Sequence, residues 1–122
     1  MMLEWERAED VVAELYLARR QPGSGNMRGL LTKQDAISGT HLIEVKSKRT
    51  DKRYSLKRDT LVSLRTRAAR LGRAPVIAVV FEGTGCLIIL HADADDVLAA
   101  MGKRKCMTVQ TEMPAPWKRN VV

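Results

Sequence analysis

Two stretches of the chain have apolar residues at the spacing of an amphipathic helix. In the first, residues 4–18, the apolar stripe consists of Ala8, Val11, Val12 and Leu15. In the second, residues 56–71, it consists of Leu61, Leu64, Ala68 and Leu71. Ser55 is the expected N-cap of the second helix, and Gly72 is expected to end it. A third, short helix is expected to start after the capping residue Asp93 and to run through Met101, before Gly102.

Three other stretches have the patterns of strands. Residues 41–47 alternate apolar and polar side chains from Leu42 onward, which is typical of a strand. Residues 75–81 form a continuous apolar run, as in a central strand covered on both faces. After a turn at 82–85, residues 86–90 are expected to pair back beside that strand. Residues 27–40 are compatible with two short strands and a turn, whereas residues 103–122 have no clear period.

This order of helices and strands predicts an α/β sandwich with a mixed central β-sheet flanked by helices. The chain has 122 residues, of which 45% are apolar, so we expect one domain over 1–122 with a C-terminal tail at 103–122. The two cysteines, Cys86 and Cys106, are too few for a disulfide framework and form no metal-ligand pair. No apolar run approaches the roughly 20 residues of a membrane span, and the acidic start is unlike a signal peptide. We therefore expect a cytoplasmic protein with no membrane partner.

Positive charge is concentrated in one part of the chain. The net charge is +7, and residues 46–73 have eleven Lys and Arg against two Asp and Glu. Residues 1–45 have a net charge of −2, and residues 74–122 have five basic and five acidic residues. Such clustering favours a nucleic-acid backbone as partner, because each phosphate contact releases counterions. A basic surface that only keeps the protein soluble is the alternative. With five aromatic residues in the chain, stacking of single-stranded bases is not expected.

Glu44 and Lys46 are two residues apart in the 41–47 strand, so they lie on the same face of it. An acid beside an amine on an inner strand is costly unless the pair has a task, although an ordinary ion pair is the alternative. Asp35 precedes Glu44 by nine residues, and a strand folding back would bring it to the same end. Two converging carboxylates repel unless a divalent cation lies between them, and oxygen ligands suit Mg²⁺. For Asp35 alone, a turn position is the alternative.

Two further features lie nearer the N-terminus. Glu9 is at the edge of the apolar stripe of the first helix, where an ordinary exposed carboxylate is the alternative. In the loop Pro22-Gly23-Ser24-Gly25, glycines let the backbone approach a phosphate and Ser24 offers a hydroxyl donor, although a linker can have the same composition. The loop is neither a Walker loop nor a dinucleotide fingerprint. His41 and His91 are not expected to act as general bases.

Taken in order, the helix glutamate, the Pro-Gly-Ser-Gly loop, the aspartate and the Glu-x-Lys strand resemble the PD-(D/E)XK nuclease superfamily. Within it, the chain is most similar to the Holliday junction resolvases of archaea and their phage-encoded relatives, over residues 6–82. The most similar segments are 19–25, 42–47 and 73–81. Gln34 stands where the name of the motif has proline, and the Ser24-to-Asp35 spacing is longer than in the archaeal members.

The resemblance implies a restriction-endonuclease-like fold and a Mg²⁺-dependent nuclease of a prokaryotic cytoplasm, with Mn²⁺ as an expected substitute. It implies metal ligation by Glu9, Asp35, Glu44 and the Val45 carbonyl. Lys46 would orient the attacking water and stabilise charge on the phosphate, and Ser24 would hold the scissile phosphodiester. The expected DNA-binding residues are Arg20, Gly23, Ser24, Gly25, Lys48, Arg49, Lys52, Arg53, Lys57 and Arg58. Arg65, Arg67, Arg70 and Arg73 are expected to extend this basic surface along the second helix.

The function that these residues predict is a structure-selective endonuclease that resolves four-way DNA junctions. The resemblance implies a homodimer, since two symmetric subunits suit two symmetric cuts. One alternative is a nuclease of the same superfamily that acts on flaps, nicks or a restriction site. Another is a non-catalytic module that binds duplex DNA. Asp35, Glu44 and Lys46 discriminate between the classes, because a pure binding protein gains nothing from acids that face phosphates.

Overall fold

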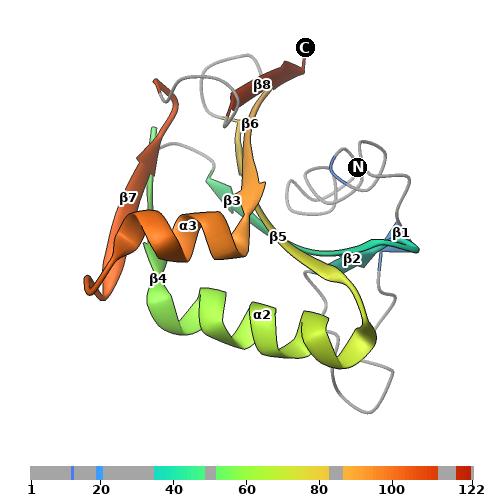
Figure 1. Cartoon of the computed structure of the whole chain (residues 1–122). Coiled ribbons are helices and arrows are strands. Elements are labelled where there is room, and N and C mark those ends of the chain that lie inside the picture. Colours follow the sequence, from blue (N-terminus) through green and yellow to red (C-terminus); the bar gives the residue numbers. More distant parts are fainter. Residues whose placement is uncertain are drawn as a thin grey trace.

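The computed structural model describes residues 12, 19–20, 35–48, 52–82, 87–112 and 118–121 (Figure 1). The elements of this part of the chain are, in order, β1 (Arg19–Arg20), β2 (Asp35–Ile37), β3 (His41–Lys48), β4 (Arg53–Lys57), α2 (Arg58–Leu71), β5 (Ala74–Phe81), β6 (Leu87–Asp93), α3 (Ala94–Met101), β7 (Cys106–Gln110) and β8 (Lys118–Val121). The helix expected over 4–18 lies outside the described residues except for Val12, which is helical and fully buried. Neither described helix is long and apolar enough to cross a membrane.

The main sheet is mixed, as the sequence predicts. Its described strands have the order β1-β2-β3-β5-β6-β8. β3 and β5 are parallel, with α2 in the crossover between them, and every other neighbouring pair of this sheet is antiparallel. β5 lies between β3 and β6, and its residues from Pro75 to Phe81 are all buried. This central position explains why the strand is apolar on both faces.

The helices α2 and α3 lie on the same face of the sheet as Leu42 of β3 (Figure 1). Leu61, Leu64 and Ala68 of α2 share one core with alternate residues of β5, and Val97 and Met101 of α3 join it. Alternation along β3 places Glu44 and Lys46 on this helix-covered face, because they are two and four residues after Leu42. The helix-covered face of β3 is therefore the one that carries the candidate site.

Both expected helix ends around α2 and α3 are confirmed by their backbone geometry. Gly72 follows α2 in the left-handed conformation, with φ of 68°, and its N–H donates to the Ala69 carbonyl. This positive φ explains the glycine, since other residues rarely adopt it. At the start of α3, Oδ1 of Asp93 accepts hydrogen bonds from the N–H groups of Asp95 and Asp96, at 2.8 and 3.4 Å.

Two predictions from the chain pattern were wrong. Ser55 is not an N-cap but lies in the middle of β4, and α2 begins only at Arg58. Residues 103–122, for which no period was found, contain β7 and β8. The misassigned β4 and the missed β7 have one cause, because these two strands pair antiparallel in a separate two-stranded sheet, whereas β8 pairs with β6. A five-residue strand paired with a segment about fifty residues away leaves too short an alternation to recognise.

Candidate active site

Asp35 and Glu44, the two carboxylate residues singled out in the sequence, are opposite one another in paired strands. β2 and β3 are antiparallel, and the register aligns Asp35 with Glu44, Ala36 with Ile43 and Ile37 with Leu42. Directly opposed residues of antiparallel strands share a face of the sheet. The strand pairing thus places Asp35 on the face of Glu44 and Lys46, as expected from a strand that folds back over this region.

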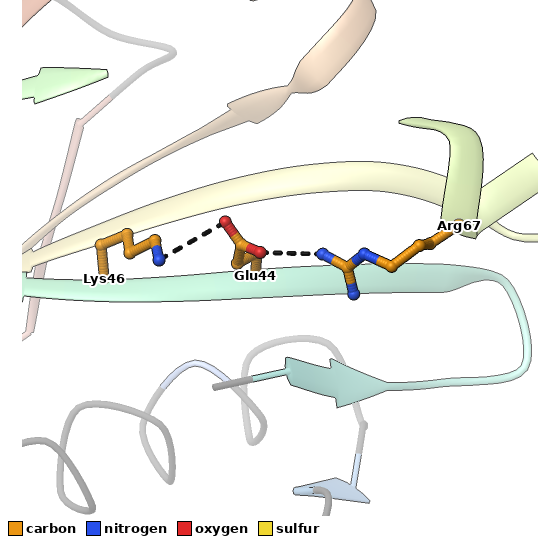
Figure 2. Close-up of polar contacts among 3 residues, drawn as sticks. All are labelled: Glu44, Lys46 and Arg67. Atoms are coloured by element: carbon orange, nitrogen blue, oxygen red, sulfur yellow. Dashed lines mark hydrogen bonds and ion pairs between the residues drawn. The ribbon is translucent and has the colours of Figure 1, made fainter. Parts of the chain in front are cut away.

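The Glu44 carboxylate is buried between two cationic groups (Figure 2). Its Oε1 accepts a hydrogen bond from Nη2 of Arg67 on α2, at 2.8 Å. Its Oε2 lies 3.6 Å from Nζ of Lys46 on the same strand. The exposed fractions of the Glu44, Arg67 and Lys46 side chains are 8%, 12% and 22%, so Lys46 is the most accessible of the three.

Because the Glu44 carboxylate is buried, it depends on its cationic partners for stabilisation. A carboxylate removed from water is stable only when charge-assisted hydrogen bonds replace its hydration, and the Arg67 guanidinium provides one. With Lys46 on the other side, two positive charges flank one negative charge. Within this group of three side chains, the positive charges of Arg67 and Lys46 therefore outnumber the negative charge of Glu44.

Tyr54 of β4 is a residue of this region that sequence reasoning missed. Its burial and the nearby Glu44 carboxylate both raise the pKa of the phenol, so that Tyr54 stays neutral and can donate a hydrogen bond. Nζ of Lys48, at the end of β3, lies 5.9 Å from the centroid of the Tyr54 ring. The signal was the alternation of Tyr54 and Leu56 on one face of residues 53–57, of which we assigned Ser55 to the N-cap of a helix and residues 56–57 to its start.

Arg67 was also misassigned. We expected the arginines of the second helix to form one DNA-facing surface, but their side chains have different surroundings. Arg67 contacts Glu44, and Arg73 donates from Nε to the Ser38 carbonyl at 2.8 Å. Arg65 lies 3.7 Å from the Asp95 carboxylate of α3, whereas Arg70 is exposed. The expectation of a continuous basic surface along α2 is therefore wrong for Arg67, which helical periodicity turns toward Glu44, and stays a prediction for the exposed Arg65 and Arg70.

The remaining basic candidates follow the chain from β3 into α2. Lys48 is half-buried, Lys52, Arg53 and Lys57 are exposed, and Arg58 is partly buried. The predicted site residues that lie outside the described part of the chain are Glu9, Gly23, Ser24, Gly25 and Arg49. The same holds for the side chains of Arg20 and Asp35, whose backbones belong to β1 and β2.

The donors of this region fit a hard divalent cation. Asp35 and Glu44 are both carboxylates on adjacent strands, and the Val45 carbonyl is a further oxygen donor next to Glu44. Oxygen donors of this kind suit Mg²⁺ and Mn²⁺ rather than softer metals. Within the described residues, no three His, Cys, Asp or Glu side chains form a metal-binding group. A complete ligand set therefore requires the Asp35 side chain and a residue beyond that part of the chain, for which Glu9 is the candidate from the sequence.

Comparisons with known proteins give a match among solved structures. No family model and no curated protein matches the chain. Among solved structures, the chain is similar to Archaeoglobus fulgidus Hjc, a Holliday junction resolvase from an archaeal hyperthermophile. The alignment covers 98% of this chain and 93% of that one, with a TM-score of 0.57 and 19% sequence identity. The chain therefore has the restriction-endonuclease-like fold of an archaeal Holliday junction resolvase, which confirms the fold class and the resemblance indicated by the sequence.

Proposed function

We propose that the protein is a metal-dependent endonuclease that hydrolyses the backbone of four-way DNA junctions. The observation that carries the proposal is the alignment of Asp35 with Glu44 across two strands, with Lys46 on the same face. In a fold shared with a resolvase, this combination of two carboxylates and an amine is suited to phosphodiester hydrolysis. A protein that only bound DNA would gain nothing from acids at this position, since they repel phosphates.

Each residue has a separate task in this mechanism. Asp35, Glu44, the Val45 carbonyl and Glu9 would hold the cation, which when bound polarises the phosphoryl oxygens and activates water. Arg67 fixes the Glu44 carboxylate by occupying Oε1, so that Oε2 is the oxygen on the Lys46 side. The partly exposed Lys46 ammonium orients the attacking water and stabilises negative charge on the phosphate. Ser24 holds the scissile phosphodiester.

DNA would be bound through its phosphates by the basic residues next to the site. The expected contacts from the described chain are Lys48, Lys52, Arg53, Lys57 and Arg58. The other expected contacts are Arg20, Gly23, Ser24, Gly25 and Arg49. Phosphate contacts depend on the path of the DNA backbone and not on the base sequence, which suits a structure-selective enzyme. A homodimer would place two such sites symmetrically on the two strands to be cut.

The test is a comparison of substrates. The protein is incubated with labelled four-way junction, flap, nicked duplex, linear duplex and single strand, each with Mg²⁺, Mn²⁺ or EDTA. We expect cleavage of the junction with either metal and none with EDTA, with Glu44→Gln as the inactive control. Preferential cutting of flaps, nicks or one linear sequence would assign another substrate within the same fold. Binding of duplex DNA with no cleavage of any substrate would identify a non-catalytic module.

A further inference from the structure

A second basic cluster is formed by two segments that are far apart in the sequence. Residues 74–122 have no net charge, yet Lys103, Arg104 and Lys105 are consecutive within them. The pairing of β4 with β7 aligns Lys57 with Cys106, directly after this tripeptide. At the adjacent position, the N–H of Arg58 donates to the Lys105 carbonyl at 2.8 Å. We name the cluster of Lys57, Arg58, Lys103, Arg104 and Lys105 the basic turn. It lies where the chain passes from α3 into β7, beside the start of α2 (Figure 1).

The two arginines of the basic turn hold its backbone in place. Nε of Arg58 donates to the Arg104 carbonyl at 2.9 Å. Arg104 in turn donates to the Met101 and Ala100 carbonyls, both at 3.1 Å. These carbonyls belong to the last turn of α3, where a positive side chain is favourable. The two arginines therefore have a structural role, in addition to the phosphate contact expected of Arg58.

The three lysines have no such explanation. Lys57, Lys103 and Lys105 are all exposed. Among the described residues, no carboxylate forms an ion pair with any member of the basic turn. Three solvated ammonium groups on a frame held by backbone hydrogen bonds form a local excess of positive charge, which attracts a polyanion.

We propose that Lys103 and Lys105 extend the DNA contact expected at Lys57 and Arg58, so that the whole basic turn binds phosphates of a duplex arm away from the cleavage site; this inference rests on the proposed function. The distance along α2 supports it. Arg67, which contacts Glu44, is nine residues after Arg58, or about 14 Å at the rise of an α-helix. That is the length of about four base pairs of duplex. A single arm entering the site can therefore reach the basic turn.

The experiment removes the lysines and leaves both arginines intact. The variant Lys57→Gln/Lys103→Gln/Lys105→Gln is compared with the charge-preserving variant Lys57→Arg/Lys103→Arg/Lys105→Arg. Affinity for the four-way junction is measured in EDTA over a range of salt concentrations. For the glutamine variant, we expect affinity to fall about fivefold for each lost phosphate contact near 0.15 M salt, and the salt slope to fall by about one per contact. The arginine variant should match the wild type in both quantities.

Three results would overturn the inference, and they are distinguishable. If the wild-type protein cuts the junction but the glutamine variant binds it with unchanged affinity and salt slope, the basic turn, Lys57 included, is not a DNA contact, whereas the proposed cleavage reaction stands. If the wild-type protein neither binds nor cuts any DNA, both proposals fail together. If the glutamine variant melts at a lower temperature than the wild type, Lys103→Gln and Lys105→Gln are tested singly, and wild-type affinity in both would also exclude the contact.

Discussion

Arg67 of α2 donates a hydrogen bond to the Glu44 carboxylate of β3 across 23 residues of sequence. Through this hydrogen bond, the crossover helix α2 contacts a candidate catalytic residue directly. It also determines how the carboxylate is turned, because Oε1 accepts from Arg67 while Oε2 is on the side of Lys46. The stability of the fold and the geometry of the site are therefore linked through one buried ion pair.

Removal of the guanidinium should destabilise the protein. Arg67→Met leaves the Glu44 carboxylate buried without its hydrogen-bonded partner, which should lower the free energy of unfolding by about 3 kcal/mol. Urea unfolding at neutral pH measures this change. Arg70→Met, an exposed position on the same helix, is the matched control and should change stability by less than about 0.5 kcal/mol. Equal stability of the two variants would show that the Glu44–Arg67 pair contributes little.

The double variant Glu44→Gln/Arg67→Met tests the coupling of the same two residues. Because it removes both charges, it should be more stable than Arg67→Met alone. The interaction free energy follows from the four unfolding curves of the cycle. A value near zero would mean that Arg67 acts on stability through other contacts.

Loss of either strand carboxylate should abolish cleavage. Asp35→Asn and Glu44→Gln should each lower the cleavage rate about a thousandfold or more, because each removes an anionic ligand of the proposed cation. Binding of the junction in EDTA should be unchanged or tighter, since a charge that repels phosphate is gone. Gln at position 44 can still accept from Arg67, so this variant should remain folded. Cleavage near the wild-type rate with Mg²⁺ would show that the site is elsewhere.

Loss of the Lys46 ammonium group should lower the rate of DNA cleavage and leave the affinity for the junction unchanged. Lys46→Met removes the ammonium group next to Glu44 and should lower single-turnover cleavage about 10²- to 10³-fold. Affinity for the junction in EDTA should change little, because one partly buried amine contributes few of the phosphate contacts. If affinity fell as much as the rate, Lys46 would be a DNA-binding residue and not part of the chemistry.

The raised pKa of Tyr54 predicts a loss of stability in alkali. Burial, and next the Glu44 carboxylate, raise this pKa above its ordinary value of 10.0. Above about pH 10 the unfolded chain therefore loses the phenolic proton while the folded chain keeps it, so stability falls as pH rises. Tyr54→Phe should remove this part of the decline. Urea unfolding of both proteins between about pH 8 and pH 11 measures it, and parallel pH curves would contradict the prediction.

Arg49 and Arg53, two basic residues that follow β3 in the chain, should contribute to DNA affinity through charge alone. Arg49→Glu/Arg53→Glu should weaken binding of the junction and reduce the slope of log affinity against log salt by about two, one for each lost contact. Arg49→Lys/Arg53→Lys keeps both charges and serves as the control. A salt slope equal to that of the wild type would show that neither arginine contacts the DNA.

Local patterns in the chain were sufficient for much of this fold. The apolar run at 75–81, the alternation after Leu42 and the capping residue Asp93 identified β5, β3 and α3, and Gly72 correctly marked the end of α2. The placement of Glu44 and Lys46 on one face also followed from the sequence. All of these features depend on residues within a few positions of one another, where backbone periodicity and capping act.

Contacts between distant segments were decided only by the tertiary structure. The alignment of Asp35 with Glu44 depends on the register of two strands, and the hydrogen bond from Arg67 depends on how α2 packs over the sheet. Because β4 pairs with β7, α2 begins at Arg58 and not at the predicted residue 56. The same pairing places Lys103–Lys105 beside Lys57. Such pairings depend on which apolar surfaces are buried together and which backbone hydrogen bonds form across the whole chain. A short stretch of sequence does not specify which distant segment it pairs with.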